Sequence, residues 1–533
     1  MDRRAFLQSA VLAGAVRGLP EAPRSAGRPP PSQGQAFELE EATIATLSEG
    51  MSSGRWTARG ITEQYLARIA AVDQAGPTLR SVLEINPEAL AIADQLDAER
   101  KASGSRGALH GIPVLVKDNL DTGDRMSTTA GSLALAGTRA SRDSTVVANL
   151  RRAGVVLLGK TNLSEWANYR STSSTSGWSG LGGLTRNPYV LDRSACGSSS
   201  GSGAAAAANL AAVTIGTETD GSVTCPASIC ALVGIKPTVG LVSRAGIIPI
   251  SATQDTAGPM CRTVTDAALV LEAIQGADPR DPATSRAAGR MARSYRDALQ
   301  RGALKGKRLG VARRGFGLPS SVNPVLTEAI AALRALGAVI LDPAEVPNAE
   351  KLGDPEIVVL DFEIKAGLAE YLATRDQRTE VRTLADIIDF NTANREKEMP
   401  WFGQEIFQRA QKRGPLTDPV YRTALATCRR LSRGLGIDAL MARLRLDAIV
   451  AITAGPSWPI DLVNGDRYTG GATSPAAVAG YPHITVPAGW VHGLPIGLSF
   501  FGRAWSEAKL IGMAFDFEQG TGARRAPQFL PTV

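Results

Sequence analysis

Three scarcities narrow the function of this 533-residue chain before any motif is considered. It has 3 histidines, and neither these nor its cysteines stand in the spacing of a zinc site. No interior segment supplies the roughly eighteen uninterrupted apolar residues that a membrane span needs, so we expect none. The net charge of +7 is modest for this length and partly concentrated near the N-terminus, so we expect no nucleic-acid partner.

Cysteine is also scarce. The chain has 5 cysteines, an odd number, and no C-x-x-C pair. We therefore expect small buried apolar side chains rather than a disulfide framework or a metal site. The positions concerned are Cys196, Cys225, Cys230, Cys261 and Cys428.

The N-terminus differs in composition from the rest of the chain. Arg3 and Arg4 precede a weakly apolar run, and sequence rich in Gly, Pro, Ser and Arg follows to about residue 35. This pattern is typical of a twin-arginine export signal with a linker, although Arg17 ends the apolar run early and leaves a disordered basic tail as the alternative. We predict a signal and linker over residues 1–36, a catalytic domain over residues 37–533, and an exported protein, periplasmic or secreted. The protein is cytoplasmic if the signal does not function.

From residue 37 the chain alternates between two kinds of pattern. Apolar residues at three-and-four spacing predict helices over residues 37–51, 57–72, 87–101, 144–153, 262–275 and 324–336. Short apolar runs predict strands near residues 111–117, 155–159, 338–341, 447–453 and 483–487, and residues 354–445 are expected to be mostly helical. This alternation predicts an α/β fold with one large domain and helices on both faces of a central sheet.

Residues 191–238 contain two turns built from small residues. Residues 197–203 are all Gly or Ser, and Asp220-Gly221-Ser222 forms the second turn, with one expected helix and one expected strand between them. Because glycines let backbone amides approach a ligand closely, this arrangement favours chemistry that uses a hydroxyl and backbone donors. The first turn lacks the Lys-Ser/Thr ending of a phosphate-binding loop.

Two hydrolytic mechanisms fit these serines. Residues 197–201 match the G-x-S-x-G pattern of α/β-hydrolases, which would make the protein an esterase with His483 or His492 as its base. Alternatively, a neutral lysine activates a serine, directly or through a second hydroxyl. Lys117 ends a buried apolar strand, where burial would disfavour its charged form.

At this point the sequence resembles the amidase signature family over residues 108–277 and again over residues 480–498. The resemblance implies a central mixed sheet and a catalytic triad of Lys117, Ser198 and Ser222. In it Ser222 is the nucleophile, Ser198 carries a cis peptide bond, and no metal or organic cofactor is needed. The same resemblance implies an oxyanion hole made by the backbone amides of Thr219, Asp220, Gly221 and Ser222. It also implies an acyl pocket bordered by Ala167 and Tyr169.

Some positions depart from the common pattern of the family, among them Cys196, Asp220 and Thr224. Residues 219–226, Thr-Asp-Gly-Ser-Val-Thr-Cys-Pro, are most similar to the peptide amidase branch, which removes ammonia from C-terminal peptide amides. The resemblance thus implies a peptide amide or another small amide as substrate. Two alternatives remain: an amidotransferase component that works with partner subunits on charged tRNA, and a non-catalytic relative that only binds ligands in its cleft.

Overall fold

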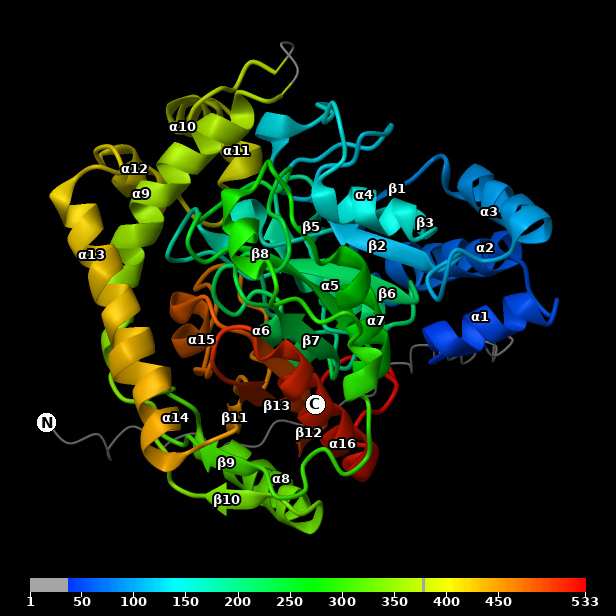
Figure 1. The fold of residues 1–533 in the computed structure, drawn as a ribbon. Coiled ribbons are helices and arrows are strands. Elements are labelled where there is room, and N and C mark those ends of the chain that lie inside the picture. Colours follow the sequence, from blue (N-terminus) through cyan, green and yellow to red (C-terminus); the bar gives the residue numbers. More distant parts are fainter. Residues whose placement is uncertain (1–36, 376–378) are drawn as a thin grey trace, which may run out of the picture. The chain divides into compact units, whose positions relative to one another are not determined.

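The computed structural model describes residues 37–375 and 379–533, and one compact unit runs from Glu41 to Val533 (Figure 1). The predicted export signal, residues 1–36, lies outside the described residues, so that signal and its boundary stay predictions. Within the described ranges, no helix combines the length and the apolar character that crossing a membrane would need.

An eleven-stranded mixed sheet forms the centre of this unit. Parallel pairs such as β2 with β6 occur beside antiparallel pairs such as β12 with β13, so the sheet is mixed, as the resemblance implied. In spatial order the strands are β1 (Val82–Ile85), β3 (Val156–Thr161), β2 (Pro113–Lys117), β6 (Val213–Glu218), β8 (Thr256–Cys261), β7 (Val233–Lys236), β12 (His483–Val491), β13 (Leu494–Phe501), β11 (Ala448–Ile452), β9 (Arg308–Val311) and β10 (Val339–Leu341). A separate pair consists of β4 (Trp178–Ser179) and β5 (Gly183–Leu184).

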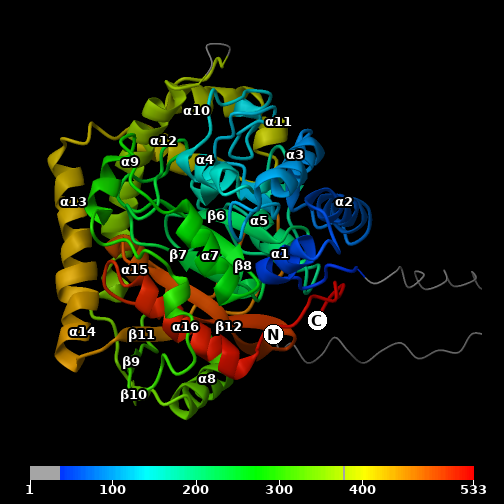
Figure 2. The same cartoon turned by 45° about the vertical axis from the view of Figure 1, so that its right-hand side comes forward.

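Helices cover both faces of the sheet, as predicted (Figures 1 and 2). A Cβ at Gly497 of β13 would lie 2.8 Å from the Ser228 hydroxyl of α6 (Thr224–Ile229). Phe500, three residues further along β13 and therefore on the opposite face, packs against Phe517 of α16 (Glu507–Thr521) with ring centroids 5.9 Å apart. The two helices thus lie on opposite sides of the strand.

Most predicted helices form with small shifts at their ends. The remaining helices are α1 (Ile44–Ser52), α2 (Ala58–Arg68), α3 (Ala89–Ser103), α4 (Thr145–Arg152), α5 (Ser200–Ala207), α7 (Val264–Ile274), α8 (Asn323–Ala335), α9 (Gly353–Leu372), α10 (Leu384–Ala393), α11 (Arg395–Glu398), α12 (Glu405–Gln411), α13 (Pro419–Arg429), α14 (Asp438–Leu444) and α15 (Ser474–Ala479). The helix predicted from residue 37 was wrong at its start. Thr43 is the N-cap, and because its hydroxyl accepts the N–H of Thr46, the helix begins only at Ile44.

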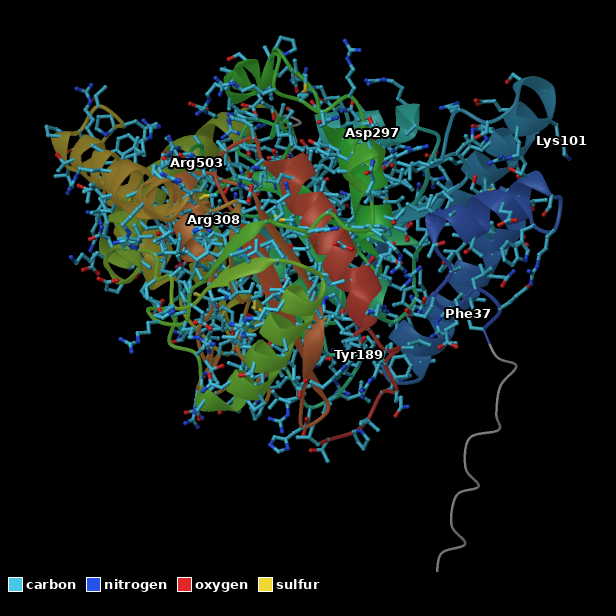
Figure 3. The ribbon with its side chains drawn as sticks, turned by 60° about the horizontal axis from the view of Figure 1, so that its bottom comes forward. Phe37, Lys101, Tyr189, Asp297, Arg308 and Arg503 are labelled. Carbon is cyan, nitrogen blue, oxygen red and sulfur yellow. A yellow bond between two sulfur atoms is a disulfide. The ribbon has the colours of Figure 1, made fainter. Side chains whose placement is uncertain are left out.

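Residues 354–445, which were expected to be mostly helical, pack beside the sheet, where α9 and α13 run next to each other (Figures 1 and 2). Leu360 and Ile364 of α9 share an apolar cluster with Trp166 and Ile250, which come from loops after β3 and β7. At the other end of this region, Arg308 of β9, labelled in Figure 3, donates to the carbonyl of Leu444 in α14. The region therefore joins the edge of the sheet to the loops at its centre.

Candidate active site

Two neighbouring strands bring the predicted catalytic residues to the same place, the carboxyl ends of strands in the middle of the sheet. β2 and β6 pair in parallel, with Val116 opposite Ile215, so their carboxyl ends lie side by side. Lys117 is the last residue of β2, and the turn that carries Ser222 follows β6. In α/β sheets the carboxyl ends of strands are the common place for a site.

The amine of Lys117 is completely buried and surrounded by oxygens. Its Nζ lies 2.7 Å from the Ser198 hydroxyl, 3.1 Å from that of Ser199 and 2.9 Å from that of Thr217. Burial lowers the pKa of Lys117 to about 7, against the opposing effect of the Asp255 and Glu218 carboxylates. A substantial fraction of the amine is therefore neutral at neutral pH.

The hydrogen bonds around this amine distinguish the two adjacent serines. The Ser199 hydroxyl donates to the carbonyl of Thr217 at 3.1 Å, so its oxygen can only accept from Lys117. A neutral amine has two hydrogens and one lone pair. The charged amine donates to Ser198. In the neutral form, with its two hydrogens directed to Ser199 and Thr217, its lone pair faces Ser198 and can accept that proton.

Ser198 and Ser222 occupy different depths. Ser198 is fully buried and follows a cis peptide bond after Gly197, as the resemblance implied. Ser222 lines an open cavity of about 500 Å³. The N–H of Ser199 donates to the carbonyl of Ser222 at 3.2 Å, which ties the two turns together. The hydroxyl of Ser222 is thus within reach of a ligand, while Lys117 and Ser198 are shielded from bulk water.

The turn after β6 is fixed by two buried carboxylates. Glu218 accepts the N–H groups of Val223 and Thr224, each at 2.8 Å, at the start of α6. Asp255 accepts the hydroxyl of Thr219 at 2.6 Å. Gly221 has φ +77°, a conformation that favours glycine. All four residues predicted for the oxyanion hole, Thr219, Asp220, Gly221 and Ser222, line the cavity.

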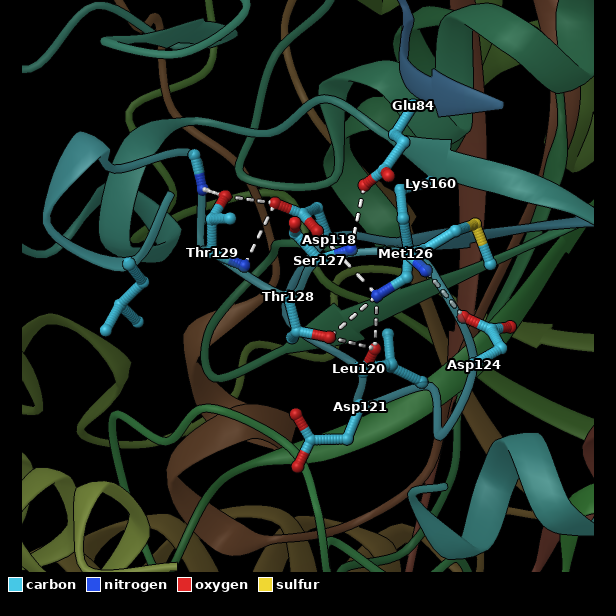
Figure 4. Close-up of polar contacts among 12 residues, drawn as sticks. Glu84, Asp118, Leu120, Asp121, Asp124, Met126, Ser127, Thr128, Thr129 and Lys160 are labelled. Atoms are coloured by element: carbon cyan, nitrogen blue, oxygen red, sulfur yellow. Dashed lines mark hydrogen bonds and ion pairs between the residues drawn. The ribbon is translucent and has the colours of Figure 1, made fainter. Parts of the chain in front are cut away.

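The turn that follows Lys117 is held by a second buried lysine, Lys160 of β3, as Figure 4 shows. Its Nζ donates to the carbonyl of Leu120 at 2.9 Å and to the Thr128 hydroxyl at 2.8 Å, and it lies 3.7 Å from the Asp118 carboxylate. Asp118 in turn accepts the hydroxyl and the N–H of Thr129. Asp118 thus fixes the backbone beyond Lys117.

The residues predicted for the acyl pocket also line the cavity. Ala167 has φ +54°, and the Tyr169 hydroxyl donates to Asp361 of α9 at 3.0 Å. Trp178 does not line the cavity and packs on Phe402 with ring centroids 5.1 Å apart. The loop after β3 and helix α9 therefore form one wall together.

The polar side chains of the cavity are acidic or neutral. Burial raises the pKa values of Asp220 and Glu356, and the negative charge of Asp220 raises that of Glu356 further. Asp466 is a third carboxyl group on the wall. Among the described residues, no Lys, Arg or His lines this cavity.

Cys196 and Cys225 form a disulfide, so the prediction that all five cysteines are unpaired was wrong for these two. Cys196 stands two residues before Ser198, and Cys225 stands three after Ser222. Because the two turns meet at the cavity, the Cα atoms of Cys196 and Cys225 lie 6.2 Å apart, a distance that a disulfide can bridge. Cys230, Cys261 and Cys428 are free and buried, as expected.

The histidines do not support the esterase alternative. His483 is buried in β12, its Nε2 lies 2.6 Å from the Ser499 hydroxyl, and burial lowers its pKa to about 3. His492 is exposed in the turn between β12 and β13. Ser199, the nucleophile that the G-x-S-x-G pattern requires, donates its proton to Thr217 instead. Across the described ranges, no group of three or more His, Cys, Asp or Glu side chains is arranged to hold a metal ion.

Three features of the site were missed from the sequence. Thr217 lies beside the lysine, and the alternation of side chains along β6 was a signal for it. The disulfide had a signal in the position of one cysteine next to each serine turn. Glu356 had none, because α9 is far along the chain from the catalytic turns.

Comparison with known proteins identifies the family. A model of the Amidase family matches residues 60–511. A probable amidase of Arabidopsis thaliana is 42% identical over 504 residues, covering 93% of each chain. One component of glutamyl-tRNA(Gln) amidotransferase from Acinetobacter baumannii is 35% identical over 500 residues, covering 91% of this chain and 97% of that one.

Solved structures agree with these sequence matches. Native peptide amidase from Stenotrophomonas maltophilia superposes with a TM-score of 0.88 at 50% identity, covering 92% of this chain and 99% of that one. The same values hold for a structure of peptide amidase in complex with the competitive inhibitor chymostatin. The chain therefore belongs to the amidase signature family and is an amide-hydrolysing enzyme.

Proposed function

We propose that the protein hydrolyses the terminal carboxamide of peptide amides, or of similar small amides, through an acyl-enzyme on Ser222. The observation that carries this proposal is the buried amine of Lys117, 2.7 Å from the Ser198 hydroxyl, behind a cavity whose wall presents Ser222. Such an arrangement can move a proton without an imidazole.

Acylation follows from the hydrogen bonds of the amine. Ser198 gives its proton to the lone pair of Lys117 and takes the proton of Ser222. The Ser222 oxygen then attacks the carbonyl carbon, and the N–H groups of residues 219–222 receive the charge that develops on the carbonyl oxygen. Each such donor contributes about 3 kcal/mol to the stability of a comparable transition state.

Release of ammonia uses the same path in reverse. Protonated Lys117 returns its proton to Ser198, which protonates the departing nitrogen as the C–N bond breaks. Water then replaces ammonia: it loses a proton to the relay, attacks the ester carbon, and frees Ser222 and a carboxylic acid.

The charge of the cavity supports an uncharged or cationic substrate. Asp220, Glu356 and Asp466 line it, whereas none of the described Lys, Arg or His residues does. A peptide amide has no terminal carboxylate, whereas the product does, so like charge opposes rebinding of the product. The 50% identity to peptide amidase, which is solved with a competitive inhibitor, favours the same substrate class.

Assay of the purified chain for ammonia release from peptide amides tests the proposal. We expect release by the chain alone and its loss in Ser222→Ala, because no other oxygen takes the nucleophile's place. We also expect near-complete loss in Lys117→Ala at neutral pH. Ser174→Ala is a matched control, since Ser174 lines the same cavity and its hydroxyl makes no hydrogen bond.

Two results would contradict the proposal: full activity in Ser222→Ala, or loss of activity only when a histidine is replaced. The amidotransferase alternative, favoured by the 35% identity to the Acinetobacter baumannii protein, predicts no release without partner subunits.

A further inference from the structure

Four arginines surround a second, smaller cavity of about 230 Å³. Arg286 and Arg290 come from the segment after α7, Arg429 is the last residue of α13, and Arg433 follows one turn later. The lining residues of this arginine cavity are all different from those of the catalytic cavity. No Asp or Glu among the described residues lines it.

The charges of these arginines are not neutralised locally. None of the four forms an ion pair with a carboxylate of the described chain, and only Arg433 makes a side-chain hydrogen bond, from Nε to the carbonyl of Ala479 at 2.8 Å. Burial lowers the pKa of Arg433, and the positive charges of Arg429 and Arg286 lower it further. Tyr481 and Asp438 act in the opposite direction. The four cations thus repel one another across a shared space.

Asp438 is a carboxylate whose negative charge raises the pKa of Arg433, and it is already engaged. It accepts the hydroxyl of Tyr481 at 2.9 Å and lies 3.5 Å from Arg503, the residue labelled in Figure 3. It therefore does not balance the arginine cavity.

Two of the four guanidinium groups stack on aromatic rings. Arg290 lies over Trp505 at 5.5 Å, and Arg433 lies over Tyr481 at 5.6 Å. Stacking occupies the flat face of a guanidinium and leaves its N–H edge free for a second partner. This arrangement reduces the entropy that a ligand would otherwise lose by ordering long side chains.

We propose that the arginine cavity binds a compact, multiply charged oxyanion of the phosphate class. Guanidinium edges match phosphate oxygens in pairs, and a dianion relieves the repulsion among the four cations. Two sources share this chemistry, inorganic phosphate and the phosphate group of a small monoester. A neighbouring cavity of about 900 Å³ shares Arg286 with this one and offers space for the organic part of an ester.

Calorimetric titration of the full chain with inorganic phosphate, at ionic strength held constant with chloride, tests the site. We expect saturable binding by the wild type and at least tenfold weaker binding by Arg286→Met/Arg429→Met. Both residues are exposed and make no side-chain hydrogen bond or ion pair within the described chain, so the variant should fold. Arg422→Met/Arg430→Met is the control, because it also removes two exposed charges, both from the helical stretch that carries Arg429 and both outside the cavity.

The control should bind phosphate as the wild type does. Absence of binding by the wild type would overturn the proposal, and so would equal weakening in the two double variants, which would show a general charge effect. Titration with glycerol phosphate separates the sources. Tighter binding than phosphate indicates an ester that extends into the larger cavity, and weaker binding indicates the free ion. Ammonia release is measured in parallel, so failure here is distinguishable from failure of the proposed hydrolysis.

Discussion

The contrast between Ser198 and Ser199 is the most informative feature at the scale of single residues. Both hydroxyls contact the amine of Lys117, at 2.7 and 3.1 Å. The Ser199 hydroxyl donates its proton to the carbonyl of Thr217 and also accepts the N–H of Thr217 at 3.2 Å. The hydroxyl of Ser199 is therefore a fixed support, while Ser198 keeps a proton that can move.

Replacing each serine by alanine separates these roles. Ser198→Ala should lower kcat by about 10²–10⁴, because both the relay to Lys117 and the acid for ammonia are lost. Ser199→Ala should lower kcat by roughly tenfold or less, since the amine of Lys117 loses only one neutral acceptor and such a hydrogen bond contributes about 1 kcal/mol. Steady-state kinetics on one peptide amide checks both variants. Equal losses, or the reverse order, would show that the relay is assigned to the wrong serine.

At the scale of elements, the close packing of the buried helix α5 determines the position of the first serine turn, residues 197–203. The helix begins at Ser200, directly after Ser198 and Ser199, and every one of its residues is buried. A Cβ at Gly201 would lie 2.4 Å from the carbonyl oxygens of Asn162 and Ser81, so the helix is in backbone contact with the loops beside β1 and β3. Only glycine permits this approach.

Gly201→Ala should therefore push α5 outward. We expect a loss of about 1–3 kcal/mol or more in the free energy of unfolding, with a fall in kcat because Ser198 moves with the helix. Gly434→Ala is the control: nothing lies within 4 Å of its added Cβ, and it should leave activity unchanged. Urea denaturation and ammonia release measure the two effects. A Gly201→Ala protein with wild-type stability and activity would contradict this view of α5.

At the scale of the whole molecule, the catalytic cavity, which Ser222 lines, is assembled from segments distant in the sequence. Its walls come from the loop after β3, the turn after β6, helix α9 and the segment before α15. The catalytic turns could be predicted because Lys117, Ser198 and Ser222 lie in short local patterns of strand ends and glycine turns. The alternation of helices and strands was predictable for a similar reason, because periodicity is a local signal.

Long-range features could not be predicted in this way. The contact between Tyr169 and Asp361, and the carboxyl pair of Asp220 and Glu356, depend on how α9 packs against the sheet. The Cys196–Cys225 disulfide depends on the meeting of two turns, and counting cysteines gave the wrong answer. Tertiary packing decides such contacts, and one sequence carries no periodic pattern for them.

The disulfide should contribute to the stability of the whole chain. It joins residues 29 apart in sequence, and closing a loop of this size stabilises a protein by about 2–4 kcal/mol, chiefly by restricting the unfolded chain. Cys196→Ala/Cys225→Ala should therefore unfold at a lower temperature than the wild type. Added reductant should lower the wild-type midpoint toward that of the variant and leave the variant unchanged. Identical midpoints for wild type and variant under oxidising conditions would contradict this role.

The pH dependence of kcat/KM for a peptide amide tests the buried neutral lysine most directly. The base must be deprotonated, so kcat/KM should rise with pH, reach half its maximum near the Lys117 pKa of about 7, and then level off. The Asp255 carboxylate raises this pKa, so Asp255→Asn should move the rising limb to lower pH. A profile that stays flat through neutral pH, or a limb that Asp255→Asn moves upward, would contradict the assignment of Lys117 as the base.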